Sequence, residues 1–129
     1  MGACKFRGGT SSVGTSRFRQ EAAVADLVRH PSIVRLLDVY YAQDKVHLVY
    51  ELAGADLKSY VEASVAPGSA LESGQIRDCL LQLLSALSHM HSKALVHTDV
   101  KPSNIFVRSP SPWLCVLGDL GCTVEACRA

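Results

Sequence analysis

The clearest repeat of apolar positions lies between residues 75 and 92. Apolar side chains recur there at steps of three and four residues, which is the period of one helix face. The repeating positions are Ile76, Leu80, Leu83, Leu84, Leu87 and Met90. The pattern predicts a long amphipathic helix whose apolar stripe packs in the core.

The N-terminal part shows a second helical pattern, preceded by shorter segments. Residues 17–29 are mostly good helix formers, and the helix is expected to end at Pro31 because the residue before a proline avoids the helical region. Ahead of this helix, residues 3–6 predict a fragment of a strand. The small residues 8–16 predict a connecting loop.

Two apolar runs then predict the strands of a hairpin. The runs are residues 33–41 and 46–51, and the polar residues between them suit a turn. A short helix is predicted over residues 57–63, with Asp56 in the place of an N-cap.

Short strands are also predicted in the C-terminal third of the chain. Residues 95–96, 105–107 and 114–117 are apolar runs of strand length. Residues 65–74 and 108–112 are rich in turn formers such as Pro, Gly and Ser. Helices mixed with short strands predict an α+β fold class.

The composition is that of one soluble domain. The 129 residues are 48% hydrophobic and carry a formal net charge of +1, and no apolar run is long enough to span a bilayer. So balanced a charge gives no reason to expect nucleic acid or membrane as a partner. The five cysteines form no C-x-x-C pair, which is typical of reduced thiols, so we expect a cytoplasmic or nuclear protein.

The densest polar chemistry lies in residues 97–104, which read H-T-D-V-K-P-S-N. Asp99 offers a carboxylate, Lys101 a cation and Asn104 an amide oxygen. Phosphoryl transfer needs a carboxylate to orient a hydroxyl, positive charge for the phosphate and oxygen ligands for Mg²⁺. Another carboxylate, Asp119, follows a predicted strand in the sequence G-D-L-G. The two segments together predict a site for phosphoryl transfer.

These two segments resemble the catalytic loop and the metal-binding loop of eukaryotic protein kinases. The Lys-Pro-Ser-Asn sequence after Asp99 is similar to the Ser/Thr-specific type, and H-P-S-I-V from His30 onwards is similar to cyclin-dependent and related kinases. The resemblance implies a truncated two-lobe kinase-like fold. About residues 1–52 would be the remainder of the small lobe, and residues 53–129 the start of the large lobe through the D-L-G loop.

The resemblance assigns catalytic roles by position. Asp99 would orient the substrate hydroxyl and accept its proton, and Lys101 would steady the transferring phosphoryl group. Asn104 would be both a catalytic residue and, with Asp119, a ligand of Mg²⁺. His97 would brace the loop by packing and hydrogen bonding. The implied cofactors are ATP and Mg²⁺.

The resemblance places the ATP contacts in the N-terminal half. Lys5, held by Glu21, would bind the α- and β-phosphates, although each residue by itself is most simply an exposed charge. Backbone groups of Glu51 and Ala53 would pair with adenine, and Tyr50 would be the gatekeeper beside the base.

Asp56 has two interpretations. It could reach the ribose of the nucleotide, or it could serve only as the cap of the short helix that follows. The residues alone leave both open.

The chain also departs from the kinase pattern. Few residues precede Lys5 or follow Gly121, so we expect a partial domain that transfers phosphate weakly or not at all by itself. The apolar face of the helix over residues 75–92 would then be open to a protein partner. Thr98 stands where many kinases carry an arginine that reads activation-loop phosphorylation, and that switch is expected to be absent. Leu120 replaces the usual Phe and keeps an apolar side chain.

Three functions are consistent with these features. The first is a protein Ser/Thr kinase, which transfers the γ-phosphate of ATP to a hydroxyl of a protein substrate. The second is a non-catalytic kinase-like module that acts as a binding partner. The third is a small-molecule kinase of the aminoglycoside phosphotransferase type, which shares the H-x-D-x-x-x-x-N loop. Lys101-Pro102 and the hinge-like stretch around Glu51 favour a protein kinase.

Overall fold

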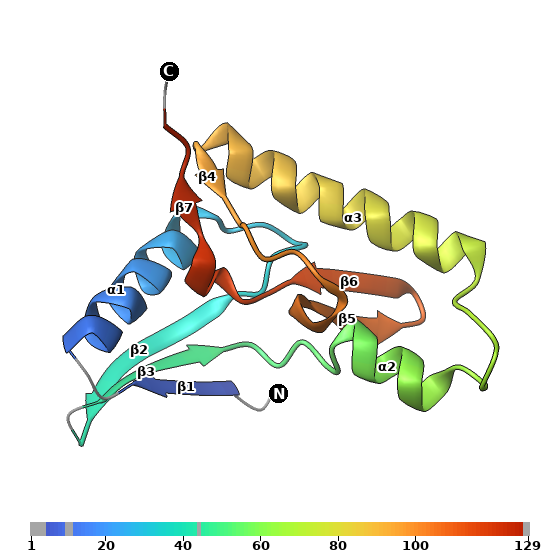
Figure 1. Cartoon of the computed structure of the whole chain (residues 1–129), viewed down its shortest axis with the longest axis horizontal. Helices are drawn as coiled ribbons and strands as arrows, with labels where there is room; N and C mark the ends of the chain where they lie inside the picture. Colours follow the sequence, from blue (N-terminus) through green and yellow to red (C-terminus); the bar gives the residue numbers. More distant parts are fainter. Residues whose placement is uncertain (1–4, 10–11, 44, 128–129) are drawn as a thin grey trace.

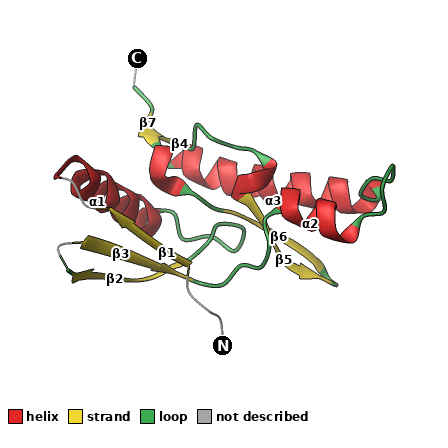
Figure 2. Ribbon diagram, turned by 60° about the horizontal axis from the view of Figure 1, so that its bottom comes forward, coloured by secondary structure: helices red, strands yellow, loops and turns green. Residues whose placement is uncertain are grey.

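The structure is a computed structural model that describes residues 5–9, 12–43 and 45–127, with side chains from residue 16 onwards (Figure 1). The elements form two groups joined by the segment after Tyr50. One group is a three-stranded sheet with a helix packed along it. In the other, two helices lie beside a two-stranded antiparallel pair (Figure 2).

The first group consists of β1 (Lys5–Gly9), α1 (Ser12–Leu27), β2 (Leu36–Ala42) and β3 (Lys45–Tyr50). The strands are antiparallel in the order β1-β3-β2. Every second residue of β3 is buried, because side chains alternate between the two faces of a strand. The buried side chains of β3 contact those of α1 and so fix the helix against the sheet.

The predicted hairpin of β2 and β3 is confirmed, but β2 begins later than expected. It starts at Leu36, because Ile33 instead forms an isolated bridge to Leu117 in the second group. The predicted loop over residues 8–16 is wrong: Gly8 and Gly9 belong to β1, and α1 begins at Ser12. Small residues can extend a helix once it is nucleated, since each further residue adds one hydrogen bond.

The second group contains the remaining elements. Their bounds are α2 (Leu57–Ser64), α3 (Ser73–Ser92), β4 (Leu95–Val96), β5 (Ile105–Pro110), β6 (Trp113–Leu117) and β7 (Val124–Glu125), with the 3-10 turns η1 (Pro102–Asn104) and η2 (Leu120–Cys122). The predicted helices and strands are confirmed with small changes at their ends. The predicted turn over residues 108–112 is shorter than expected, because residues 108–110 continue β5 in its pairing with β6.

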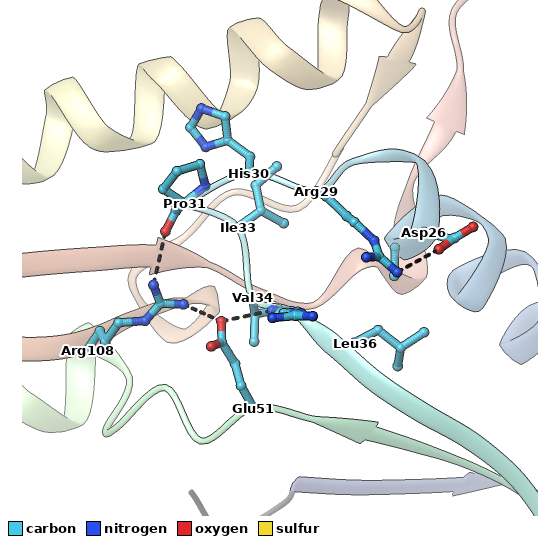
Figure 3. Close-up of a pocket in the computed structure, with 11 residues that line it drawn as sticks. Asp26, Arg29, His30, Pro31, Ile33, Val34, Leu36, Glu51 and Arg108 are labelled. Carbon is cyan, nitrogen blue, oxygen red and sulfur yellow. Dashed lines mark hydrogen bonds and ion pairs between the residues drawn. The ribbon is translucent and has the colours of Figure 1, made fainter. Parts of the chain in front are cut away.

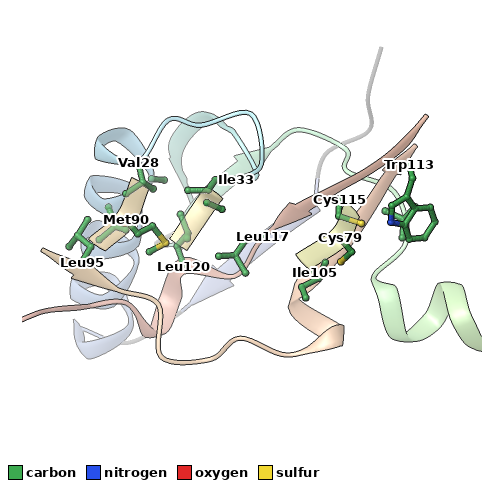
Figure 4. Close-up of a cluster of buried hydrophobic side chains, with 14 residues drawn as sticks. Val28, Ile33, Cys79, Met90, Leu95, Ile105, Trp113, Cys115, Leu117 and Leu120 are labelled. Carbon is green, nitrogen blue, oxygen red and sulfur yellow. The ribbon is translucent and has the colours of Figure 1, made fainter. Parts of the chain in front are cut away.

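The main core lies where α1, α3 and the pair of β5 and β6 meet (Figure 4). Met90 of α3, Leu117 of β6 and Leu120 of η2 are almost completely buried there. Burying side chains of this size stabilises the fold by about 1.5–3 kcal/mol each. Asp119 therefore lies between two core side chains, Leu117 before it and Leu120 after it, which anchor its backbone.

The prediction that the whole apolar stripe of α3 packs in the core is wrong. Met90 is buried, but the exposed fractions are 44% for Ile76, 51% for Leu80 and 60% for Leu84. Smaller cysteine and alanine side chains of α3 are buried instead, because the strands that α3 contacts, β6 and β4, are short. Part of the apolar face is thus open, as expected for a partial domain. Within the described residues, no helix combines the length and apolarity needed to cross a membrane.

The segment that joins the two groups passes very close to β5 at Gly54. The φ angle of Gly54 is +85°, and a Cβ atom there would lie 2.1 Å from the carbonyl oxygen of Val107. Nearby, the backbone N–H of Val107 donates to the carbonyl of Ala55 at 2.8 Å. Only glycine fits this approach without moving the backbone.

A second link between the groups is made by His30. Its Nδ1 accepts a hydrogen bond from the backbone N–H of Ser32 at 3.0 Å, and its Nε2 lies 3.1 Å from the hydroxyl of Ser85 on α3. Its ring centroid is 5.1 Å from that of His89, also on α3. Burial, and then the nearby His89, lower the pKa of His30 from its ordinary value of 6.5.

We expect Gly54→Ala to destabilise the chain much more than Gly68→Ala. Both glycines have positive φ, but a Cβ at Gly68 would meet nothing within 4 Å. Gly68→Ala should cost about 1–2 kcal/mol through the left-handed backbone alone. Urea denaturation of the two variants measures the difference. Equal losses would contradict the close approach to Val107.

We expect the chain to become less stable as the pH is lowered, and His30 to contribute to this loss. Because folding lowers the pKa of His30, the unfolded chain binds more protons as the pH falls below 6.5. The contribution of neutral His30 is therefore fully present above pH 6.5 and is lost as the pH falls through the lowered value of the folded chain. Urea denaturation at about pH 7.5 and about pH 5.5 should show a smaller drop for His30→Asn than for wild type. His91→Asn, at an exposed position, is the control and should behave like wild type.

Candidate active site

A buried histidine holds the loop of residues 97–104. His97 is 1% exposed, its Nε2 donates to the carbonyl of Gly118 at 2.8 Å, and its Nδ1 accepts from the N–H of Asp99 at 3.2 Å. Because Nδ1 is an acceptor, the neutral ring carries its proton on Nε2. His97 thus ties the loop to the residue before Asp119, which confirms its predicted bracing role.

Asp99, Lys101 and Asn104 are brought together within this loop. The Nδ2 of Asn104 donates to the backbone oxygen of Asp99 at 2.8 Å and to its Oδ2 at 3.0 Å. The Nζ of Lys101 lies 3.4 Å from the same Oδ2. The turn η1 makes these contacts possible, because the N–H of Asn104 donates to the carbonyl of Lys101 at 2.9 Å. One carboxylate oxygen of Asp99 is therefore held by an amide and a cation.

Asp119 lies next to this loop because β5 pairs with β6. The N–H of Gly118 donates to the carbonyl of Asn104 at 2.8 Å, which continues the pairing of Ile105 with Leu117. Asp119 has a φ angle of +53°, a conformation that costs energy in a residue other than glycine. Its carboxylate accepts from the N–H of Gly121 at 3.4 Å.

The oxygen atoms of Asn104 and Asp119 fit a magnesium ion. Since the Nδ2 of Asn104 is used on Asp99, its Oδ1 is the atom left for a ligand, and no donor from the described residues reaches it. Amide and carboxylate oxygens are the hard ligands that Mg²⁺ prefers, usually with water completing the octahedron. The prediction that both residues bind Mg²⁺ stays a prediction, and the chemistry of their oxygen atoms suits it.

A cleft opens beside Asp119, between the three-stranded sheet and β5. Its walls are apolar side chains and the backbone of the segment after β3. The lining residues are Glu21, Val34, Phe106, Asp119 and residues 50–54. Among the described residues, neither the carbonyl of Glu51 nor the backbone of Ala53 has a hydrogen-bond partner. These are the groups predicted to pair with adenine, and a flat base with a polar edge suits such a wall.

Glu21 reaches the rear of the cleft and is not an exposed charge. It is 3% exposed, and its Oε1 accepts a hydrogen bond from the hydroxyl of Tyr50 at 2.6 Å. The backbone of Lys5 pairs with that of Tyr50 across β1 and β3. The side chain of Lys5 lies outside what the structure describes, so its pairing with Glu21 stays a prediction.

Asp56 is the N-cap of α2. Its Oδ1 accepts from the N–H of Ser59 at 2.9 Å, and its Oδ2 accepts from the hydroxyl of Ser59 at 2.8 Å. The cap interpretation is therefore confirmed. Asp56 does not line the cleft, and its contact with the ribose stays a prediction.

The side chain of Glu51 points away from the cleft, toward a larger cavity of about 470 Å³ (Figure 3). Its Oε1 accepts from Arg108 of β5 and, at 3.0 Å, from the N–H of Arg35. Arg108 also donates to the carbonyl of Pro31 at 3.1 Å. Sequence reasoning missed Arg108, because no local pattern marks a contact between such distant positions. This cavity contains none of the predicted catalytic or metal-binding residues.

We expect Tyr50→Phe to destabilise the chain by roughly 1–3 kcal/mol, because the buried carboxylate of Glu21 loses the hydrogen bond from the Tyr50 hydroxyl. Tyr41→Phe is the matched control, since Tyr41 is 63% exposed. Urea denaturation of both variants checks this. A loss no larger than that of the control would show that the Tyr50 hydroxyl contributes little.

Comparison with known proteins agrees with this geometry. A family model of the protein kinase domain matches residues 5–127. Cyclin-dependent kinase 2 of Caenorhabditis elegans is 39% identical over 89 residues, which are 69% of this chain and 24% of that protein. The chain thus spans about a quarter of the length of this relative. With its α+β architecture of a truncated kinase-like fold, the chain belongs to the protein kinase family.

Proposed function

We propose that this chain is part of a protein serine/threonine kinase that binds Mg·ATP and transfers the γ-phosphate to a protein hydroxyl. The observation that carries the proposal is the position of Asn104. Its Nδ2 fixes Asp99, its Oδ1 is left for a metal ion, and its backbone oxygen binds the residue before Asp119. One residue thereby couples the carboxylate that would orient a hydroxyl to the atoms that would hold Mg²⁺.

Asp99 would act on the substrate hydroxyl. Its Oδ2 is held by Asn104 and Lys101, so Oδ1 is the oxygen that can orient a serine or threonine and take its proton. Lys101, beside this carboxylate, would offset charge on the transferring phosphoryl group. The Lys101-Pro102 sequence after Asp99 supports a Ser/Thr substrate over tyrosine.

The nucleotide would lie along the cleft. Mg²⁺, when bound, would neutralise charge on the phosphate oxygens, held by the Oδ1 of Asn104 and the carboxylate of Asp119. The backbone of Glu51 and Ala53 would pair with adenine, since both have unused hydrogen-bonding groups among the described residues. Lys5, whose backbone pairs with that of Tyr50, would bind the α- and β-phosphates. The boundary between the two lobes would lie near residues 52 and 53.

A second candidate is a non-catalytic kinase-like module that binds a protein partner. It is favoured by the exposed leucines and isoleucine of α3, which form one apolar face. The two candidates differ in whether the protein transfers phosphate. The membership of the protein kinase family argues against a small-molecule kinase of the aminoglycoside phosphotransferase type.

We expect Mg·ATP to raise the melting temperature of the wild-type chain, because a ligand that binds only the folded state stabilises it. At a ligand concentration 100 times the Kd, the free energy of unfolding rises by about 2.7 kcal/mol. Asp119→Ala should lose most of this gain in stability. Asp78→Ala should keep it, because Asp78 is a partly exposed residue of α3 that does not line the cleft. A wild-type melting temperature that does not change when Mg·ATP is added would contradict the proposal.

Asp99→Asn separates binding from transfer. This variant should keep the thermal shift with Mg·ATP and lose any incorporation of γ-phosphate into a protein substrate that the wild-type protein catalyses. Loss of both would instead place Asp99 in nucleotide binding.

A further inference from the structure

Three consecutive carbonyl groups directly after the metal-binding loop accept hydrogen bonds from three different side chains. The carbonyl of Gly121 accepts from the Nε of Arg17 at 3.3 Å, and that of Thr123 accepts from the Nε2 of Gln20 at 3.4 Å. Between them, the carbonyl of Cys122 accepts from the hydroxyl of Thr98 at 2.6 Å. We call residues 121–123 the clamped segment.

The donors come from two separate parts of the site. Arg17 and Gln20 lie on α1, which also carries Glu21, and a second nitrogen of Arg17 is 3.4 Å from the Sγ of Cys122. Thr98 lies in the catalytic loop, directly before Asp99. The turn η2 packs against α1, and β7 continues beside β4 (Figure 1). The clamped segment therefore lies between the helix and the loop and touches both.

Thr98 is exposed, but its backbone adopts an unusual conformation. Its φ angle is +68°, which is a genuine outlier for a β-branched residue and costs energy. The neighbouring contacts impose it: Val96 pairs with Val124, and His97 binds the carbonyl of Gly118. In this backbone position the Thr98 hydroxyl reaches Cys122 at a short hydrogen-bond distance, whereas the two bonds from α1 are long.

We propose that Thr98 is a positioning residue, which with Arg17 and Gln20 holds the clamped segment so that Asp119 stays aligned with Asp99. Thr98 acts through these two carboxylates and touches no substrate. The inference rests on the proposed function, because it concerns the binding of Mg·ATP. Since Thr98 is uncharged and its acceptor is a backbone carbonyl, the contact forms without any phosphate or other anion on the segment.

The chain offers a matched pair of substitutions to test this. Thr98→Val keeps the β-branched shape and removes the hydroxyl, and Thr98→Ser keeps the hydroxyl. Thr123→Val is the control, because the Oγ1 of Thr123 is buried and has no hydrogen-bond partner among the described residues. If Thr98→Val does not fold, Arg17→Met combined with Gln20→Leu removes the other two donors and is judged by the same criteria.

The first measurement is amide hydrogen exchange of Gly121 and Thr123 without nucleotide. Thr98→Val should speed exchange about two- to tenfold, which is the factor that one hydrogen bond provides. Thr98→Ser and Thr123→Val should exchange like wild type. Unchanged exchange in Thr98→Val would overturn the proposal.

The second measurement is the affinity for ATP with and without Mg²⁺, by calorimetry. Thr98→Val should reduce the gain in affinity that Mg²⁺ provides by about two- to tenfold and leave the affinity without Mg²⁺ unchanged, and Thr98→Ser should restore the gain. A loss of general stability would weaken both affinities alike and would overturn a positioning role. If Mg²⁺ does not increase the affinity of the wild-type chain for ATP, both the proposed function and this inference are refuted. A wild-type gain that Thr98→Val retains refutes the inference alone.

Discussion

The geometry of the site depends on the short antiparallel pairing of β5 with β6. This pairing continues from Ile105 and Leu117 to Asn104 and Gly118, so it places the loop that holds Asp99 beside the loop that holds Asp119. The register is fixed by burial, since a slip of one residue would turn every buried side chain of the pair toward solvent. Because β6 packs against α3, the packing of a helix that contributes no residue to the candidate site helps to determine where Asp99 and Asp119 lie.

A second constraint is the burial of polar groups. Glu21, His97 and Asn104 are each less than a tenth exposed, and burying such groups without hydrogen bonds would be costly. Their partners lie on other elements: Tyr50 for Glu21 and Gly118 for His97. Forming these bonds and forming the core are thus one event, and a change that loosens the core also loosens the polar site.

Local patterns in the sequence predicted what depends on near neighbours. The contacts of Asp99 with Lys101 and Asn104 fall within one loop, and the cap made by Asp56 lies within one turn of helix. The elements themselves followed from periodicity, apart from their ends. What depends on distant partners was not predictable. The two-residue strand β7 exists only through β4, and Arg108 meets Glu51 only because the chain folds back. The apolar period of α3 gave its helical state but not the face it buries, since that depends on the short strands that α3 contacts.

Position 51 combines two tasks that belong to different parts of the same residue. Its backbone faces the cleft, where any amino acid would present the same carbonyl, while its carboxylate joins β5 and the segment before β2 on the opposite side. A change of this one side chain can therefore alter the stiffness of the joint between the two halves of the molecule and leave the backbone wall of the cleft as it is. Sequence variation at this residue would therefore report on the stability of the joint and not on the choice of ligand in the cleft.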